Sequence, residues 1–203
     1  MTSHAATLNY IPAPDAPATN RRRLNLRRFF RVIERALAAV GLFFLIWHLG
    51  FGLSFVVSGS MAPTLRGNGK PGSDYVLTER FTYWLRAPRR WELIAFHNSE
   101  GLEIMKRITA LPGESVVLKK DGAFMIDGTP AERPACIRET KYYPFGRLFN
   151  DIAAPAGSGY FVLGDDSKDS DDSRFNAPVQ PADVIGRPLM IVWPPSRIGF
   201  VNP

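Results

Sequence analysis

Residues 58–65 read Ser-Gly-Ser-Met-Ala-Pro-Thr-Leu and stand where a long apolar run ends and a polar, strand-rich sequence begins. A flexible glycine separates two hydroxyl side chains, and a proline restricts the backbone three residues after Ser60. No cysteine, histidine or cluster of metal ligands lies close by in the sequence to compete for a catalytic role. These features make Ser60 a candidate nucleophile placed directly after an apolar segment.

The apolar run covers residues 36–57, reads ALAAVGLFFLIWHLGFGLSFVV and contains no Asp, Glu, Lys or Arg. As an α-helix its 22 residues would measure about 33 Å, which is enough to cross the hydrocarbon core of a bilayer at about 30 Å. We therefore expect a single N-terminal transmembrane helix over residues 34–57. A cleavable signal peptide is the alternative, but its apolar region is usually only about 7–15 residues long.

Positive charge is concentrated before the apolar run. The net charge is +6, and residues 1–35 contribute +5 of it through seven arginines against Asp15 and Glu34. Arginines beside a membrane span favour the cytoplasmic side. The sequence therefore predicts a basic, partly disordered cytoplasmic tail over residues 1–33 and a periplasmic domain over residues 58–203, attached to the bacterial inner membrane. Because little charge remains for the domain, we expect membrane lipid and no nucleic acid as a partner.

The sequence after the apolar run contains short β-type segments separated by Gly, Pro and Asp clusters, and Asp127-Gly128 favours a hairpin turn. No helical period of ten or more residues is visible between residues 70 and 203. We therefore predict a mainly-β domain of antiparallel sheets. Residues 129–159 interrupt it as a long excursion that could face the substrate. The expected strands are 75–77, 92–96, 103–111, 115–118, 124–126, 160–163 and 184–193.

A serine becomes a good nucleophile only when a neighbouring group accepts its proton. His4 lies in the tail and His48 in the apolar run, so His97 is the histidine left to the domain, and it follows a predicted strand as a solvated loop residue would. Lys106 lies inside a β-type segment, where burial would lower the pKa of its amine and allow it to act as a base. The alternative for Lys106 is a surface lysine that points outward from the strand.

The third polar patch is the aspartate-rich stretch over residues 164–174. A calcium loop beginning at Asp169 would need glycine where Arg174 stands, so this patch does not fit that metal site. An ordinary acidic loop is a second alternative. A supporting role fits better, in which Ser170 holds a neutral amine in place and Asp172 forms an ion pair with Arg174.

Neither a metal nor a cofactor is expected. Cys136 is the single cysteine, so it cannot form an intramolecular disulfide, and it lacks the neighbouring His or Cys residues of a zinc site.

With three ordered motifs after an apolar segment, the chain resembles the type I signal peptidases, which are membrane-anchored Ser/Lys endopeptidases. The resemblance covers most of residues 36–203. Residues 58–65 are similar to the family's serine motif, residues 106–114 to its lysine motif and residues 164–174 to its last motif. The resemblance implies that Ser60 is the nucleophile, that Lys106 is the general base and that Ser58 joins the Ser60 backbone N–H in an oxyanion hole. It also implies that Ser170 hydrogen-bonds the lysine and that Asp172 and Arg174 form a supporting ion pair.

The resemblance implies removal of signal peptides from exported precursors after small-x-small sites. The short excursion, the aspartate-rich last motif and the closing Trp-Pro-Pro-Ser of residues 193–196 are more similar to the conjugative-transfer peptidases that mature pilin subunits. One departure precedes the lysine motif, where Trp91-Glu92 replaces the family's usual Gly-Asp. The alternatives are a pilin peptidase that cyclises its product by acyl transfer, and a non-catalytic membrane-anchored subunit of a secretion apparatus.

Overall fold

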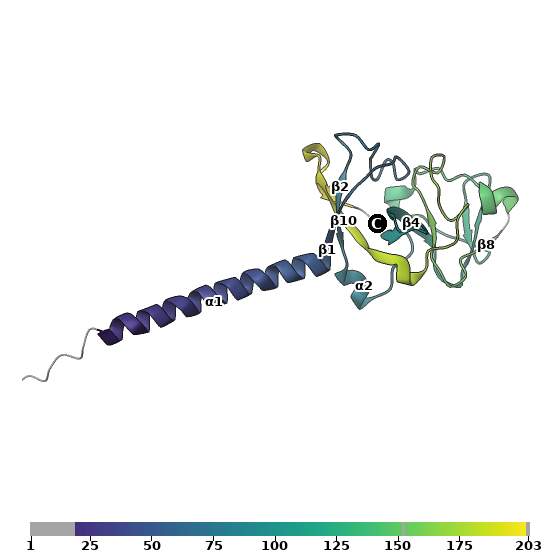
Figure 1. Cartoon of the computed structure of the whole chain (residues 1–203). Helices are drawn as coiled ribbons and strands as arrows, with labels where there is room; N and C mark the ends of the chain where they lie inside the picture. Colours follow the sequence, from purple (N-terminus) through teal and green to yellow (C-terminus); the bar gives the residue numbers. More distant parts are fainter. Residues whose placement is uncertain (1–18, 152, 202–203) are drawn as a thin grey trace, which may run out of the picture. The chain divides into compact units, whose positions relative to one another are not determined.

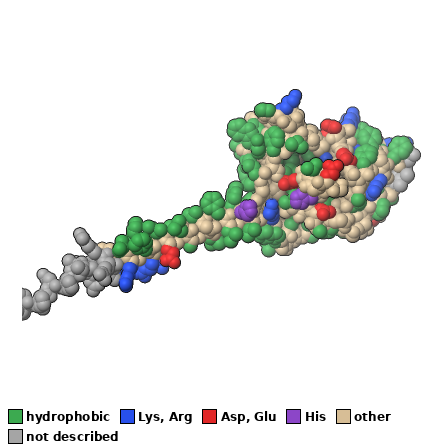
Figure 2. Space-filling view, in the orientation of Figure 1, with side chains coloured by type: hydrophobic (Ala, Val, Ile, Leu, Met, Phe, Trp, Pro, Cys, Tyr) green, Lys and Arg blue, Asp and Glu red, His purple; other side chains and the backbone are tan. Residues whose placement is uncertain are grey.

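The computed structural model describes residues 19–151 and 153–201. Two compact units make up the chain, Met1–Leu45 and Ile46–Pro203. In its described part, the first unit consists of most of helix α1, which spans Thr19–Gly50. Hydrophobic side chains cover much of this helix, and basic side chains gather near its start (Figure 2). The first part of the predicted tail, residues 1–18, lies outside the described residues.

The expectation of one helix reaching Val57 is wrong for its last seven residues. Helix α1 ends at Gly50, and β1 (Phe51–Phe55) pairs in antiparallel register with β2 (Tyr75–Glu79). A Cβ built at Gly50 would lie 1.9 Å from Cζ of Phe81, so the chain can turn from helix to strand here because this residue has no side chain. Phe51 and Phe55 at the two ends of β1 favour a β-strand, because aromatic side chains pack well on a pleated sheet. Within the described residues, no helix is both long and apolar enough to cross a membrane.

The second unit contains two antiparallel sheets, which confirms the predicted mainly-β domain. The larger sheet has the order β1-β2-β10-β3-β4-β9 with β11 paired to β10, and the smaller one has the order β7-β6-β5-β8. Figure 1 shows β1, β2 and β10 side by side. The remaining bounds in the larger sheet are β3 (Leu93–His97), β4 (Glu103–Ala110), β9 (Phe161–Leu163), β10 (Val184–Trp193) and β11 (Gly199–Phe200). The smaller sheet contains β5 (Ser115–Leu118), β6 (Phe124–Ile126), β7 (Thr129–Pro130) and β8 (Ala154–Pro155).

Helical structure in the second unit is short, as the sequence predicted for residues 70–203. Among its described residues α2 (Phe81–Leu85) is the one complete α-helix. The 3₁₀ turns are η1 (Ala135–Ile137), η2 (Gly146–Asp151), η3 (Pro181–Asp183) and η4 (Pro195–Arg197).

The excursion over residues 129–159 packs as part of the body of the domain. Its Ile137, Tyr142 and Leu148 are almost fully buried in a core shared with β5, β6 and β9. None of its described residues lines the large cleft described below. The cleft lining therefore gives no support to the prediction that the excursion faces the substrate, and several of its apolar side chains are buried in the core beside the second sheet.

Trp91, at the departure from the family pattern, has a backbone φ of 70°, in the region that favours glycine. Its side chain is buried and meets the ring of Phe124 edge to face, with centroids 5.5 Å apart. The family's usual glycine would adopt this backbone conformation without strain. In this chain tryptophan occupies the position, and its indole ring packs in the core.

Candidate active site

Ser60 and Lys106 meet in the second unit. Lys106 lies on β4 where the strand becomes continuously buried, and Ser60 lies in the turn that follows β1. The Lys106 Nζ atom donates a 2.6 Å hydrogen bond to Ser60 Oγ. Met61 and Leu65, which follow the serine, are buried in a core cluster and fix this turn to the larger sheet. The turn and the strand therefore hold the two side chains in direct contact.

Ser58 stands beside this pair. Its Oγ atom lies 3.2 Å from Ser60 Oγ, and its side chain is exposed in the lining of the cleft. A hydroxyl in this position can reach a group bound next to Ser60.

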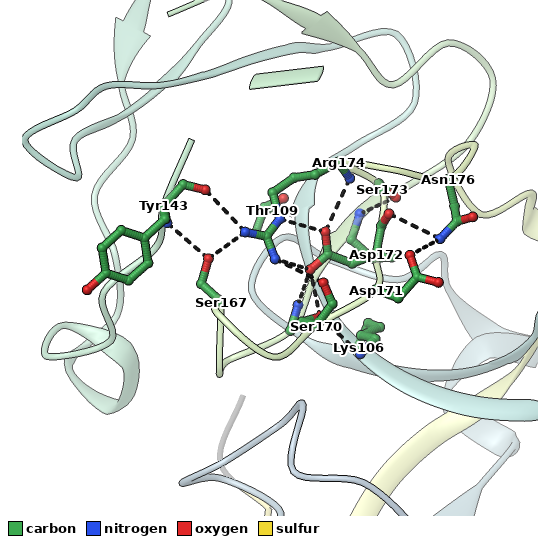
Figure 3. Close-up of polar contacts among 12 residues, drawn as sticks. Lys106, Thr109, Tyr143, Ser167, Ser170, Asp171, Asp172, Ser173, Arg174 and Asn176 are labelled. Carbon is green, nitrogen blue, oxygen red and sulfur yellow. Dashed lines mark hydrogen bonds and ion pairs between the residues drawn. The ribbon is translucent and has the colours of Figure 1, made fainter. Parts of the chain in front are cut away.

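The predicted supporting residues form a chain of contacts behind Lys106 (Figure 3). The lysine amine donates a 3.1 Å hydrogen bond to Ser170 Oγ, and the Ser170 hydroxyl donates to Asp172 Oδ2 at 2.7 Å. Arg174 contacts both oxygens of the same carboxylate, with Nε and Nη2 each at 2.8 Å. The Gly164 N–H donates to it as well, at 3.0 Å. Asp172 is therefore fully partnered although it is buried.

Burial changes the acidity of Lys106. Desolvation lowers the pKa of its amine below the usual lysine value, while the negative charges of Asp172 and Asp171 partly oppose the shift. A lowered pKa increases the fraction of neutral amine at a given pH, and only the neutral amine can accept a proton from a serine hydroxyl. The arrangement can therefore supply a nucleophile and a base.

A second buried ion pair lies next to the first, and sequence reasoning assigned it no role. Arg107 contacts both oxygens of Asp165, with Nε and Nη2 each at 2.8 Å, and neither side chain is exposed. Asp165 also accepts hydrogen bonds from Thr64 at 2.5 Å and Tyr142 at 3.0 Å. This carboxylate therefore joins all three motifs to the excursion. Two features of the sequence could have pointed to this pair: Arg107 directly follows Lys106, and Asp165 lies within the aspartate-rich motif.

The histidine alternative receives no support from the geometry. His97 is exposed at the end of β3 and does not line the cleft. No group of three or more His, Cys, Asp or Glu side chains among residues 19–151 and 153–201 could hold a metal ion. Cys136 is exposed.

A cleft of about 560 Å³ opens over the Ser60–Lys106 pair. One part is lined by the end of β1 with the turn after it and by the first half of β4. The other part is lined by the last motif, including Lys168, Asp169 and Asp171, and by Phe175 directly after it. Ser60 and Lys106 both line the cleft, so a group bound in it can reach the serine hydroxyl.

Comparison with known proteins shows the family of the chain. The family described as signal peptidase, peptidase S26 matches residues 29–193. The chain belongs to this family. It is 34% identical over 158 residues to signal peptidase I of Leptolyngbya laminosa, which covers 73% of this chain and 72% of that protein. It is 26% identical over 230 residues to signal peptidase I of Mycobacterium tuberculosis, covering 89% of this chain and 77% of that one.

Among solved structures, a signal peptidase I from Enterococcus faecalis V583 aligns with a TM-score of 0.41 and 29% identity, over 50% of this chain and 97% of that chain. Membership of the signal peptidase family makes the protein a serine endopeptidase, and therefore a hydrolase. Signal peptidases act on exported precursor proteins, and the family is typically associated with membranes.

Proposed function

We propose that the protein removes signal peptides from exported precursors with a Ser60–Lys106 dyad, cutting after small-x-small sites. The observation that carries the proposal is the 2.6 Å contact between Lys106 Nζ and Ser60 Oγ inside the cleft. A lysine with a lowered pKa supports it further, since a charged amine could not act as a base.

In the proposed mechanism, Lys106 takes the proton of Ser60 while the serine oxygen attacks the scissile carbonyl. The Ser58 hydroxyl and the Ser60 backbone N–H then donate hydrogen bonds to the oxyanion that develops. Lys106 returns the proton to the leaving amine, which departs and leaves an acyl-enzyme. Water, deprotonated by the same lysine, hydrolyses the ester and restores the serine.

Ser170, Asp172 and Arg174 act in this proposal as positioning residues. Ser170 gives the lysine amine a hydrogen-bond partner besides the nucleophile, and Asp172 orients the Ser170 hydroxyl. Arg174 balances the buried carboxylate. With its base already oriented, the site requires little rearrangement when substrate binds.

The test is cleavage of a purified precursor by the full-length protein in detergent, followed by mass spectrometry. Ser60→Ala and Lys106→Ala, made separately, should each abolish cleavage. Lys120→Ala removes an exposed lysine outside the cleft and should cleave normally. Cleavage by either dyad variant at the wild-type rate would show that the Ser/Lys mechanism is wrong. No cleavage by the wild-type protein would favour the non-catalytic alternative.

We further propose attachment to the inner membrane through the apolar part of α1, residues 36–50, with the basic residues before it in the cytoplasm and the domain after it in the periplasm. The exposed apolar side chains along α1 support lipid contact. In spheroplasts, added protease should degrade the domain and spare an epitope at the N-terminus. Protection of the domain would reverse the orientation, and extraction of the protein by alkaline carbonate would argue against a membrane anchor.

Pilin subunits are the proposed substrate class within the exported precursors, supported by the short segment between the lysine motif and the last motif. In that case the acyl-enzyme can be resolved by water or by the amino terminus of the substrate itself. A cyclic product would be one water lighter than the hydrolysed one, so the mass of the product identifies the route. Efficient cleavage of ordinary secretory precursors alone would exclude pilin specialisation.

A further inference from the structure

An exposed aromatic surface adjoins the cleft at its last-motif side. Phe175 lines the cleft and keeps 54% of its surface exposed, although it directly follows the fully buried Arg174. Phe145 from the excursion is 41% exposed. The Arg174 guanidinium lies near both rings, 5.7 Å from the centroid of Phe145 and 5.6 Å from that of Phe175. Tyr143 stacks on Phe145 at an interplanar angle of 12°. We call Tyr143, Phe145 and Phe175 the aromatic platform.

The platform is held rigidly against the last motif. Arg174 Nη1 donates to the Tyr143 carbonyl at 3.2 Å, and the Arg147 N–H donates to the Arg174 carbonyl at 2.9 Å. A Cβ on Gly146, which has a φ of +56°, would lie 2.3 Å from that carbonyl oxygen, so the two segments approach as closely as their backbones allow. Figure 3 shows Tyr143 and Lys106 at opposite ends of the resulting network.

Rigid aromatic faces open to solvent beside a cleft favour contact with an apolar ligand. Covering such rings removes apolar area from water, and an aromatic side chain loses little conformational entropy when it is ordered. The arginine also cannot move away, since its guanidinium donates to Asp172, Ser167 and the Tyr143 carbonyl. Any polypeptide leaving the cleft past Phe175 would meet this surface.

We propose that the aromatic platform forms a subsite for an aromatic or bulky apolar side chain that follows the scissile bond of the substrate. The inference rests on the proposed function, because it takes Ser60 as the residue that attacks that bond. Small side chains gain little from an open aromatic face, so the platform does not serve the small-x-small positions before the bond. Two longer segments flank those positions, and the proposal assigns the platform to the mature segment on the leaving-group side.

The test uses fluorogenic peptides that share one small-x-small sequence and carry a serine-rich segment after the scissile bond. A single phenylalanine replaces serine at each of the first five positions of that segment in turn, and kcat/KM is measured with the full-length protein in detergent. At one position phenylalanine should raise kcat/KM about tenfold, the gain expected from covering part of one ring. Phe175→Ala should remove this preference, so that kcat/KM for the phenylalanine peptide falls to about that for the all-serine peptide.

The all-serine peptide also separates contact with substrate from bracing of Arg174. If Phe175 only braced the arginine, Phe175→Ala would slow every peptide equally and move the acid limb of the rate profile. Equal slowing of every peptide, or a shift of the acid limb, would show that the proposed subsite is wrong. Phe149→Ala is the matched control, because Phe149 is 58% exposed on η2 but does not line the cleft, and it should keep the preference.

A parallel scan places phenylalanine at positions before the small-x-small sequence. A preference found only there, and lost in Phe175→Ala, would assign the platform to the signal peptide and overturn its place on the leaving-group side. Ser60→Ala distinguishes the two proposals. If it cleaves normally, the proposed function fails; if it is inactive but no peptide shows a preference for phenylalanine, only the subsite fails.

Discussion

Lys106 and Ser60 share a 2.6 Å hydrogen bond in which the lysine is 4% exposed and the serine 9% exposed. Burial of a primary amine next to a hydroxyl favours the neutral form of the amine, and the neutral form is the one that can accept the hydroxyl proton. The opposing influence comes from carboxylates behind the lysine, which favour the charged form. The pH dependence of the enzyme should therefore report the balance between these two effects.

The first prediction concerns the acid limb of kcat/KM. Because desolvation lowers the Lys106 pKa, activity should rise with pH to a plateau, with an apparent pKa below the usual lysine value of about 10.4. The unfolded chain holds the lysine proton up to that usual value, so folding stability should also rise with pH between the lowered pKa and about 10.4. Rates measured in detergent from about pH 5 to 10 test this, and a limb at or above the usual value would contradict it.

The second prediction compares two of the carboxylates that raise the Lys106 pKa, Asp171 and Asp172. Asp171→Asn and Asp172→Asn should both move the acid limb to lower pH, because each removes a negative charge that favours the protonated amine. Asp171 is exposed, so its variant should keep the wild-type melting temperature. Asp172→Asn leaves Arg174 buried without its anionic partner and should lose about 3–5 kcal/mol of stability. If the acid limb of kcat/KM stays at the wild-type pH in both variants, these charges do not influence the Lys106 pKa.

The strands could be predicted because their short apolar segments are bounded by Gly, Pro and Asp, and the segments at 115–118, 124–126 and 184–193 match β5, β6 and β10. The end of α1 could not. The mainly apolar residues 51–57 fit a helix or a strand, and β1 is fixed by pairing with β2, whose residues lie 20 to 28 positions further along the chain. Local sequence contains no signal for such a partner.

The site shows the same division. The motif residues Ser60, Lys106 and Ser170 could be nominated from sequence, and the fold brings them together across separations of 46 and 64 residues. The partnership of Arg107 with Asp165, 58 residues apart, could not be assigned, because each charge has other possible partners in the sequence. Burial decides between them, and burial is known only when the sheets are assembled.

The third prediction concerns that missed ion pair. Arg107→Met should destabilise the protein by about 3–5 kcal/mol, because it leaves the Asp165 carboxylate buried without its cation. Arg90→Met is the matched control: its pair with Glu114 at 2.5 Å is 27% and 20% exposed and should be worth only about 0–1 kcal/mol. Urea unfolding followed by tryptophan fluorescence measures both. Similar losses for the two variants would show that burial does not set the strength of these pairs.

The last prediction tests whether the base depends on how closely the last motif approaches the serine turn. A Cβ at Gly164 would lie 2.2 Å from Ser170 Oγ and 2.5 Å from the Ser60 carbonyl oxygen. Gly164→Ala should therefore displace Ser170 and the turn, weaken the alignment of Lys106 with Ser60, and lower kcat about 10- to 100-fold. KM should change less, because Gly164 does not line the cleft. The cost in stability should be about 1–3 kcal/mol, small enough for the protein to remain folded.

Gly199→Ala is the control for this change, since no atom lies within 4 Å of a Cβ at that position and its φ is not positive. It should match the wild type in kcat and in melting temperature. Full activity in Gly164→Ala, with circular dichroism showing a native sheet, would mean that the enzyme tolerates a displaced Ser170. Lys106 would then be held by β4 and by Ser60 alone, and Ser170 would have no role in orienting the base.

A second variant locates the clash. If Gly164→Ala lowers kcat and the additional change Ser170→Gly partly restores it, the clash lies at the Ser170 hydroxyl.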